Sequence, residues 1–188
     1  MTEDTIISFI EELQSHYQKE ELDKLDKFYR GGDRLTNALG VKFGMVFKTA
    51  KKFVKMPVNE IECLLESNYY EVRMGAVSIM DYQVQRKRTT EEHRKALFIL
   101  YLNRHDRIDN WDLVDRAAKR VIGAYLYDFS KDRNILYELA RSKNVWERRT
   151  AIVATSYFIT KNETEDTFNI AEILVNDKHY LIQKSVGG

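Results

Sequence analysis

The sequence predicts an all-helical fold, and three observations support this prediction. Apolar residues recur at spacings of three and four along almost the whole chain, which is typical of helices with a buried face. The chain of 188 residues has one proline and eight glycines, so residues that interrupt helices are scarce. No segment shows the strict alternation of apolar and polar residues that is typical of a half-buried strand.

The apolar periodicity places the expected helices in order along the chain, and a few residues mark their ends. The expected apolar faces lie at residues 6–13, 46–54, 61–65, 72–80, 96–100, 113–121, 135–139, 151–155 and 168–174. Pro57 suits the start of one helix, and Thr89 with Glu92 has the capping-box form at the start of another. Gly31–Gly32 mark a loop, and Gly123 is expected near the end of its helix.

The sequence also repeats itself, in residues 65–77, 140–152 and, more weakly, 175–187. Each copy ends a helix, turns at Ser or Asp, and opens the next helix with Val-Arg or its equivalent. One helix pair cannot bury its apolar face alone, so such pairs stack. The prediction is an all-α, HEAT-like α–α superhelix, a solenoid of antiparallel helix pairs forming a single domain over residues 1–188. Because the third copy stops at Gly188, we expect this domain to be truncated at the C-terminus.

Composition excludes several classes of protein. Thirty Lys and Arg against 29 Asp and Glu give a net charge of +1, so DNA binding would need basic residues segregated on one face. Cys63 is the only cysteine, and the histidines lack metal-site spacing, so we expect no metal and no cofactor. Without a phosphate loop or a nucleophile elbow, kinases and dehydrogenases are poor candidates. An acidic N-terminus and the lack of a long apolar run predict a cytoplasmic protein without a membrane segment.

Four residues form the candidate catalytic group, namely Trp111, Asp115, Arg148 and Arg149. Trp111 and Asp115 are four residues apart, so they share one face of a helix. Spacing alone favours a structural interpretation, in which Trp111 is core, Asp115 pairs with Lys119, and Arg148 is a helix-starting arginine. The alternative is that these side chains make a site.

The segments that contain these residues resemble the DNA alkylation repair family, the AlkD-like DNA glycosylases. The resemblance is carried by residues 40–42, 109–115, 146–152 and 181–187, and the Asn-Trp-Asp-Leu-Val-Asp and Trp-Glu-Arg-Arg motifs are specific in combination. It implies a HEAT-like solenoid whose concave face holds duplex DNA. It also implies metal-independent hydrolysis of the N-glycosidic bond of N3- or N7-alkylated purines.

By motif, the resemblance assigns the catalytic carboxylate to Asp115 and a site tryptophan to Trp111. The site arginine falls within Arg148–Arg149, in either register. A carboxylate can stabilise an oxocarbenium-like sugar and orient water, an indole face attracts a cationic nucleotide by about 1 kcal/mol, and arginine clamps a phosphate. The family has a further tryptophan after the Val-Gly pair, where this chain has Gly188.

Basic residues cluster along several expected helix faces. In a chain that is 31% charged, any one cluster can be a solvated face, but clusters on a common surface would bind phosphates in a salt-dependent manner. The candidate DNA contacts are Lys42, Lys48, Lys51, Lys52, Arg116, Lys119 and Lys184.

The sequence therefore favours a monomeric DNA glycosylase whose partner is duplex DNA containing alkylated bases. The alternative is a non-catalytic HEAT-like module that binds DNA or a protein through the same concave face. Release of free base from methylated DNA distinguishes these two functions.

Overall fold

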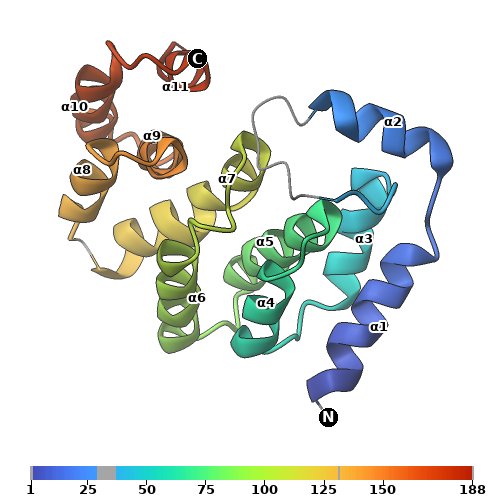
Figure 1. Cartoon of the computed structure of the whole chain (residues 1–188). Helices are drawn as coiled ribbons and strands as arrows, with labels where there is room; N and C mark the ends of the chain where they lie inside the picture. The colour runs from blue at the N-terminus through green and yellow to red at the C-terminus, as the bar shows by residue number, and fades with distance from the viewer. Residues whose placement is uncertain (1, 29–36, 131, 188) are drawn as a thin grey trace. The chain divides into compact units, whose positions relative to one another are not determined.

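The computed structural model describes residues 2–28, 37–130 and 132–187, and every regular element within these ranges is a helix (Figure 1). The predicted all-helical class is therefore confirmed. The loop expected at Gly31–Gly32 lies outside the described residues. The chain divides into two compact units, Met1–Lys87 and Arg88–Gly188, which are described separately. A single HEAT-like domain over the whole chain stays a prediction.

The first unit is built around one central helix. Its helices are α1 (Thr2–Gln14), α2 (Lys19–Phe28), α3 (Phe43–Lys52), α4 (Val58–Leu65) and α5 (Tyr70–Gln85). Helices α3 and α4 pack on α5, and α1 packs on α3 and α4. Because α5 is buried on nearly all sides, it lacks the single apolar face that the periodicity predicted. A Cβ on Gly75 would lie 2.4 Å from the Phe9 ring, so this small residue permits a close approach.

A carboxylate in α5 fixes the segment that precedes α3. The side chain of Glu71 accepts hydrogen bonds from the backbone N–H groups of Leu39 and Gly40, both at 2.8 Å, and of Val41 at 3.2 Å. Hydrogen bonds to a charged acceptor are among the stronger ones in proteins. Glu71 therefore holds the chain immediately before Lys42, the N-cap residue of α3.

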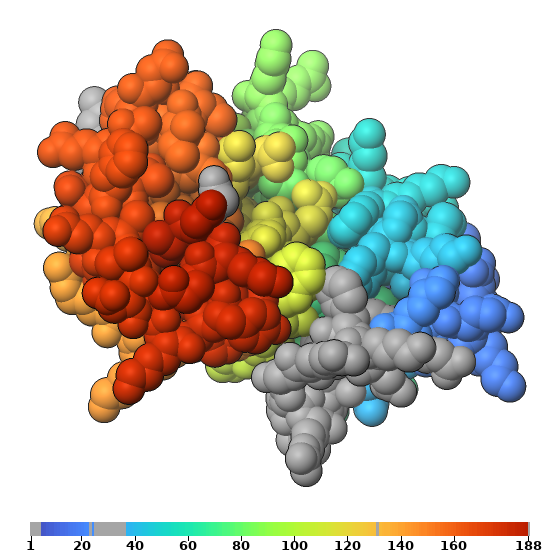
Figure 2. Space-filling view, turned by 90° about the horizontal axis from the view of Figure 1, so that it is seen from above, coloured from blue at the N-terminus to red at the C-terminus, as the bar shows by residue number. Residues whose placement is uncertain are grey.

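The second unit is built around α9. Its elements are α6 (Glu91–Asn103), α7 (Trp111–Ala118), the π-helical turns η1 (Lys119–Ala124) and η2 (Leu126–Ser130), α8 (Asn134–Ala140), α9 (Val145–Ile159), α10 (Glu165–Leu174) and α11 (Tyr180–Val186). Helices α7, α8, α10 and α11 and the η1 segment all pack on α9. The last helices, red in Figure 2, form part of the surface of this unit. None of the described helices combines the length and apolar character needed to cross a membrane.

Two local predictions are wrong. Gly123 is not near the end of its helix, because helical backbone continues from η1 through Tyr125 into η2. A Cβ on Gly123 would come 2.2 Å from the carbonyl oxygen of Ala154 in α9. The glycine is needed for contact between two helices rather than for termination. The N-cap of α6 is Thr90 instead of Thr89, because the Thr90 hydroxyl accepts the backbone N–H of His93 at 3.2 Å. Pro57 does precede α4, as predicted.

The three repeat copies share a structural contact as well as a sequence pattern. In each copy, a side chain near the start of the second helix donates a hydrogen bond to the backbone carbonyl six residues earlier. The bonds join Arg73 to Ser67 at 3.1 Å, Arg148 to Ser142 at 2.9 Å, and Gln183 to Asp177 at 2.7 Å. The sequence repeat thus corresponds to a repeated turn between helices.

Candidate functional site

Asp115 of α7 and Arg149 of α9 form a bidentate ion pair. Nε and Nη2 of Arg149 donate to the two carboxylate oxygens of Asp115 at 2.9 and 2.8 Å. The parallel geometry fixes the carboxylate in orientation as well as in position. The side chain of Arg149 is 9% exposed and that of Asp115 is 36% exposed. The guanidinium is therefore enclosed by protein while the carboxylate keeps an open face.

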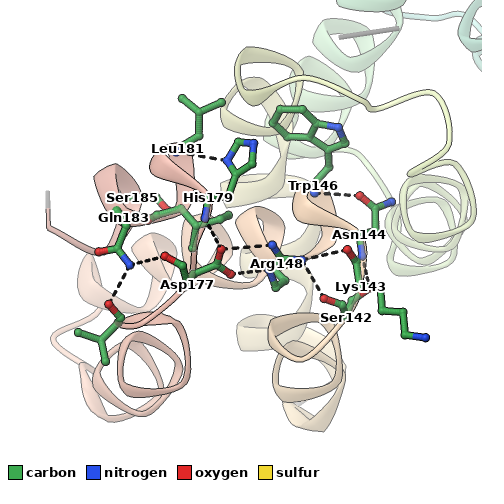
Figure 3. A network of polar contacts seen from close by, with 12 residues as sticks. Ser142, Lys143, Asn144, Trp146, Arg148, Asp177, His179, Leu181, Gln183 and Ser185 are labelled. Atoms are coloured by element: carbon green, nitrogen blue, oxygen red, sulfur yellow. Dashed lines mark hydrogen bonds and ion pairs between the residues drawn. The ribbon is translucent and has the colours of Figure 1, made fainter. Parts of the chain in front are cut away.

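Arg148 points elsewhere, toward the turns before α9 and α11 (Figure 3). It donates to both oxygens of Asp177 at 2.6 and 3.3 Å, and to the carbonyls of Ser142 and Lys143 at 2.9 and 3.0 Å. Burial raises the pKa of Asp177, but the hydrogen bonds from Arg148 and from the His179 N–H outweigh burial and leave this pKa lowered. Arg148 therefore ties two turns together.

The structure thus assigns different contacts to two arginines that the sequence motif could not distinguish. Arg149 meets Asp115, whereas Arg148 has the structural contacts of a helix-starting arginine. The alternative pairing of Asp115 with Lys119 is wrong, because Arg149 takes both carboxylate oxygens. Trp111 is half-buried at the first position of α7 rather than enclosed in the core.

Asp115 and Arg149 line a pocket of about 590 Å³ between α7, α9, α10 and α11. Its wall includes the apolar side chains of Ile152 and Phe168 and the side chain of Lys184. Charges in a partly apolar pocket interact more strongly than in bulk water, because the effective dielectric constant is lower. The open face of the Asp115 carboxylate can therefore interact with a positive charge that enters this pocket.

Thr150, the residue after Arg149 in α9, belongs to a buried series of hydrogen bonds. The Thr150 hydroxyl lies 3.2 Å from the Tyr101 hydroxyl and 3.0 Å from Nε2 of His105, whose Nδ1 lies 3.1 Å from the Leu102 carbonyl. All three side chains are almost fully buried, and burial lowers the pKa of His105 and raises that of Tyr101.

The direction of these bonds follows from the chemistry of their members. The Leu102 carbonyl can only accept, so Nδ1 of the neutral His105 ring donates and Nε2 accepts. Thr150 must then donate to Nε2 and accept from the Tyr101 hydroxyl. The polar side-chain atoms of Tyr101, His105 and Thr150 thus all have hydrogen-bond partners. These bonds fix the start of α9 and therefore the backbone from which Arg149 projects.

Replacement of Thr150 by valine, which has a similar shape, should lower the free energy of unfolding by about 2 kcal/mol, because buried groups on Tyr101 and His105 lose their partner. Urea denaturation measures this change. Thr150→Ser keeps the hydroxyl and should retain most of the stability. Equal stability of the valine variant and the wild type would contradict the assigned chain of bonds.

The predicted DNA contacts occupy different environments. Lys42, Lys48 and Lys51 are exposed on or next to α3 in the first unit. Lys52 is exposed as well but forms an ion pair with Glu12, which a phosphate would have to replace. In the second unit, Arg116 and Lys119 are half-buried, and Lys184 is exposed at the pocket. Their role in binding DNA stays a prediction.

Sequence reasoning missed several residues around the Asp115–Arg149 pair. Nη1 of Arg149 donates to the backbone carbonyl of Leu181 at 2.6 Å, and no sequence pattern indicates a carbonyl contact. Tyr101 and His105 lie outside the recognised motifs, although Thr150 lies inside one of them. Within residues 2–28, 37–130 and 132–187, no cluster of three or more His, Cys, Asp or Glu side chains has the geometry of a metal site.

Comparison with known proteins identifies the family. Residues 9–188 match the family model described as DNA alkylation repair enzyme. No curated protein sequence matches the chain significantly. The family match covers nearly the whole chain, including Trp111, Asp115 and Arg149. The chain therefore belongs to the family of DNA alkylation repair enzymes.

Proposed function

We propose that this member of a DNA alkylation repair family is a DNA glycosylase, which hydrolyses the N-glycosidic bond of N3- or N7-alkylated purines in duplex DNA. The observation that carries this proposal is the Asp115 carboxylate, held by Arg149 and open to a pocket. A fixed, partly exposed negative charge is suited to a reaction in which positive charge develops on a sugar.

The chemistry requires little from the protein beyond charge and position. An alkylated purine already carries positive charge and is a good leaving group, so bond cleavage leaves an oxocarbenium-like sugar. Each oxygen of Asp115 accepts one hydrogen bond from Arg149 and keeps lone pairs that can face this sugar or a water molecule. In the proposed mechanism, Asp115 stabilises the cation and orients the attacking water without a metal.

Arg149 and Trp111 have supporting roles in this mechanism. Nε, Nη1 and Nη2 of Arg149 each donate one hydrogen bond, and because Arg149 also lines the pocket, a remaining N–H group can donate there to the phosphate beside the lesion. Trp111 is one helical turn before Asp115, so its indole face can lie next to the same cationic nucleotide. Positioning of this kind can lower a barrier by several kcal/mol.

The repeated turns of the chain support a HEAT-like arrangement of its helix pairs. We infer that such repeats carry the DNA-binding surface, with the predicted lysines and arginines as its phosphate contacts. We further propose that the protein is monomeric and acts in the cytoplasm.

Incubation of the purified protein with duplex DNA methylated at guanine N7 tests the proposal directly. Chromatography should detect free 7-methylguanine, and a chelator such as EDTA should leave the rate unchanged. Salt-sensitive duplex binding without base release would instead indicate a non-catalytic DNA-binding module. If the protein neither binds duplex DNA nor releases the base, the result would indicate a protein scaffold.

A further inference from the structure

Three helices of the second unit can be compared by counting from their N-cap residues, which are Asn110 for α7, Asn144 for α9 and His179 for α11. The fifth residue after the N-cap is Asp115, Arg149 and Lys184, respectively. The first residue is Trp111 in α7, Val145 in α9 and Tyr180 in α11. Tyr180 and Lys184 therefore occupy in α11 the positions of Trp111 and Asp115 in α7.

The equivalence is spatial as well as numerical. Asp115, Arg149 and Lys184 all line the same pocket. Arg149 connects the outer two helices, because it donates to Asp115 in α7 and to the Leu181 carbonyl in α11. The fifth positions of α7, α9 and α11 thus converge on one pocket, and Tyr180 lies one helical turn before Lys184.

Tyr180 is an exposed aromatic ring that the protein holds in place. It is 57% exposed, and it stacks on the His179 ring with centroids 5.5 Å apart and an interplanar angle of 17°. His179 is fixed in turn, because its backbone N–H donates to Asp177 at 2.8 Å and its Nδ1 accepts the Leu181 N–H at 3.3 Å (Figure 3). The Trp146 ring makes an edge-to-face contact with the His179 ring, with ring centroids 6.1 Å apart.

Lys184 lies between the Tyr180 ring and the pocket, since it contacts the ring and also lines the pocket. Its Nζ lies 5.6 Å from the centre of the Tyr180 ring, and its side chain is exposed. The ammonium group thus lies over the neutral ring, and both are at the solvent-exposed end of the row that begins with Asp115 and Arg149. An aromatic face suits the C–H groups of a sugar, and an ammonium group suits a phosphate.

We propose that Tyr180 and Lys184 form a subsite for one nucleotide next to the lesion in the DNA backbone. The Tyr180 ring packs on its deoxyribose, and the Lys184 ammonium binds its phosphate. This inference rests on the proposed function, because it requires that duplex DNA occupies the pocket of Asp115 and Arg149. It assigns to α11 the role of binding DNA rather than of bond cleavage.

Steady-state excision of 7-methylguanine from a short duplex tests the subsite. Tyr180→Ala should raise KM about tenfold, which corresponds to about 1.4 kcal/mol, and should leave kcat unchanged because the ring does not touch the bond that breaks. Tyr180→Phe keeps the ring and should behave as the wild type. Lys184→Ala should reduce the slope of log Kd against log salt by about one ion, whereas Lys184→Arg should retain it.

Ile99→Ala is a matched control, because Ile99 is an exposed apolar residue of α6 in the same unit and should not alter KM. Thermal unfolding verifies that each variant is folded. An unchanged KM for Tyr180→Ala, a fall in kcat instead, or a Tyr180→Phe variant as weak as Tyr180→Ala would overturn the subsite. The proposed function would survive each of these results, since it depends on base release by the wild type and its loss without Asp115.

Discussion

Replacement of Asp115 by asparagine is expected to slow the release of 7-methylguanine from duplex DNA by about a hundredfold, the usual effect of removing one preorganised charge from a reaction site. Asparagine has nearly the same shape, but it has no charge to stabilise the cationic sugar. The side-chain NH2 group of asparagine would also face an N–H donor of Arg149, where the wild type has an accepting carboxylate oxygen, so one hydrogen bond of the pair is lost. Single-turnover kinetics with excess enzyme measures the effect on the chemical step alone.

Asp106→Asn provides a matched control for this variant. Asp106 also receives two hydrogen bonds from an arginine, Arg104, at 3.0 and 3.3 Å, but it does not line the pocket. Its replacement should therefore leave excision unchanged. Undiminished release by a folded Asp115→Asn variant would show that this carboxylate does not stabilise the transition state.

A methyl group added at Gly123 is expected to lower the free energy of unfolding by about 3 kcal/mol, because it would overpack the contact between η1 and α9. The added Cβ would come 2.2 Å from the Ala154 carbonyl and 3.0 Å from the Cβ of Tyr157, both in α9. Backbone atoms cannot move aside as a flexible side chain can, so η1 and α9 would have to separate. Urea denaturation of the Gly123→Ala variant measures this loss.

Gly44→Ala is the corresponding control, because nothing lies within 4 Å of a Cβ built on this exposed residue of α3. Alanine forms helices better than glycine, so this variant should be as stable as the wild type or more stable by up to about 1 kcal/mol. If both variants had equal stability, the contact between η1 and α9 would not depend on the lack of a side chain at Gly123.

The helical class could be predicted because apolar periodicity is a local property of the sequence. The same property could not show that α5 and α9 are central, because a helix that is buried on all sides carries polar residues wherever they find partners. The role of Gly123 could not be predicted for a related reason. A glycine can end a helix or admit a neighbour, and only the position of Ala154 decides between these roles.

The candidate site was predictable in its residue types but not in its pairing. Spacing predicts that Trp111 and Asp115 share one helix face, and the Trp-Glu-Arg-Arg motif contains both Arg149 and its neighbour Arg148. One residue of register separates a guanidinium that meets Asp115 from one that meets Asp177. Sequence spacing does not resolve this difference, because both arginines lie in the first turns of α9 and their partners are distant in the chain.

The bond from Arg149 to the Leu181 carbonyl has a consequence for the end of the chain. Helix α11 has seven residues, and isolated helices of this length are not stable in water. Its order therefore depends on anchors supplied by the preceding repeat, of which the Arg149 guanidinium is one. Because the same guanidinium donates to Asp115 and to the Leu181 carbonyl, the orientation of that carboxylate and the local folding of α11 are thermodynamically linked. A ligand that binds the guanidinium should therefore shift both equilibria.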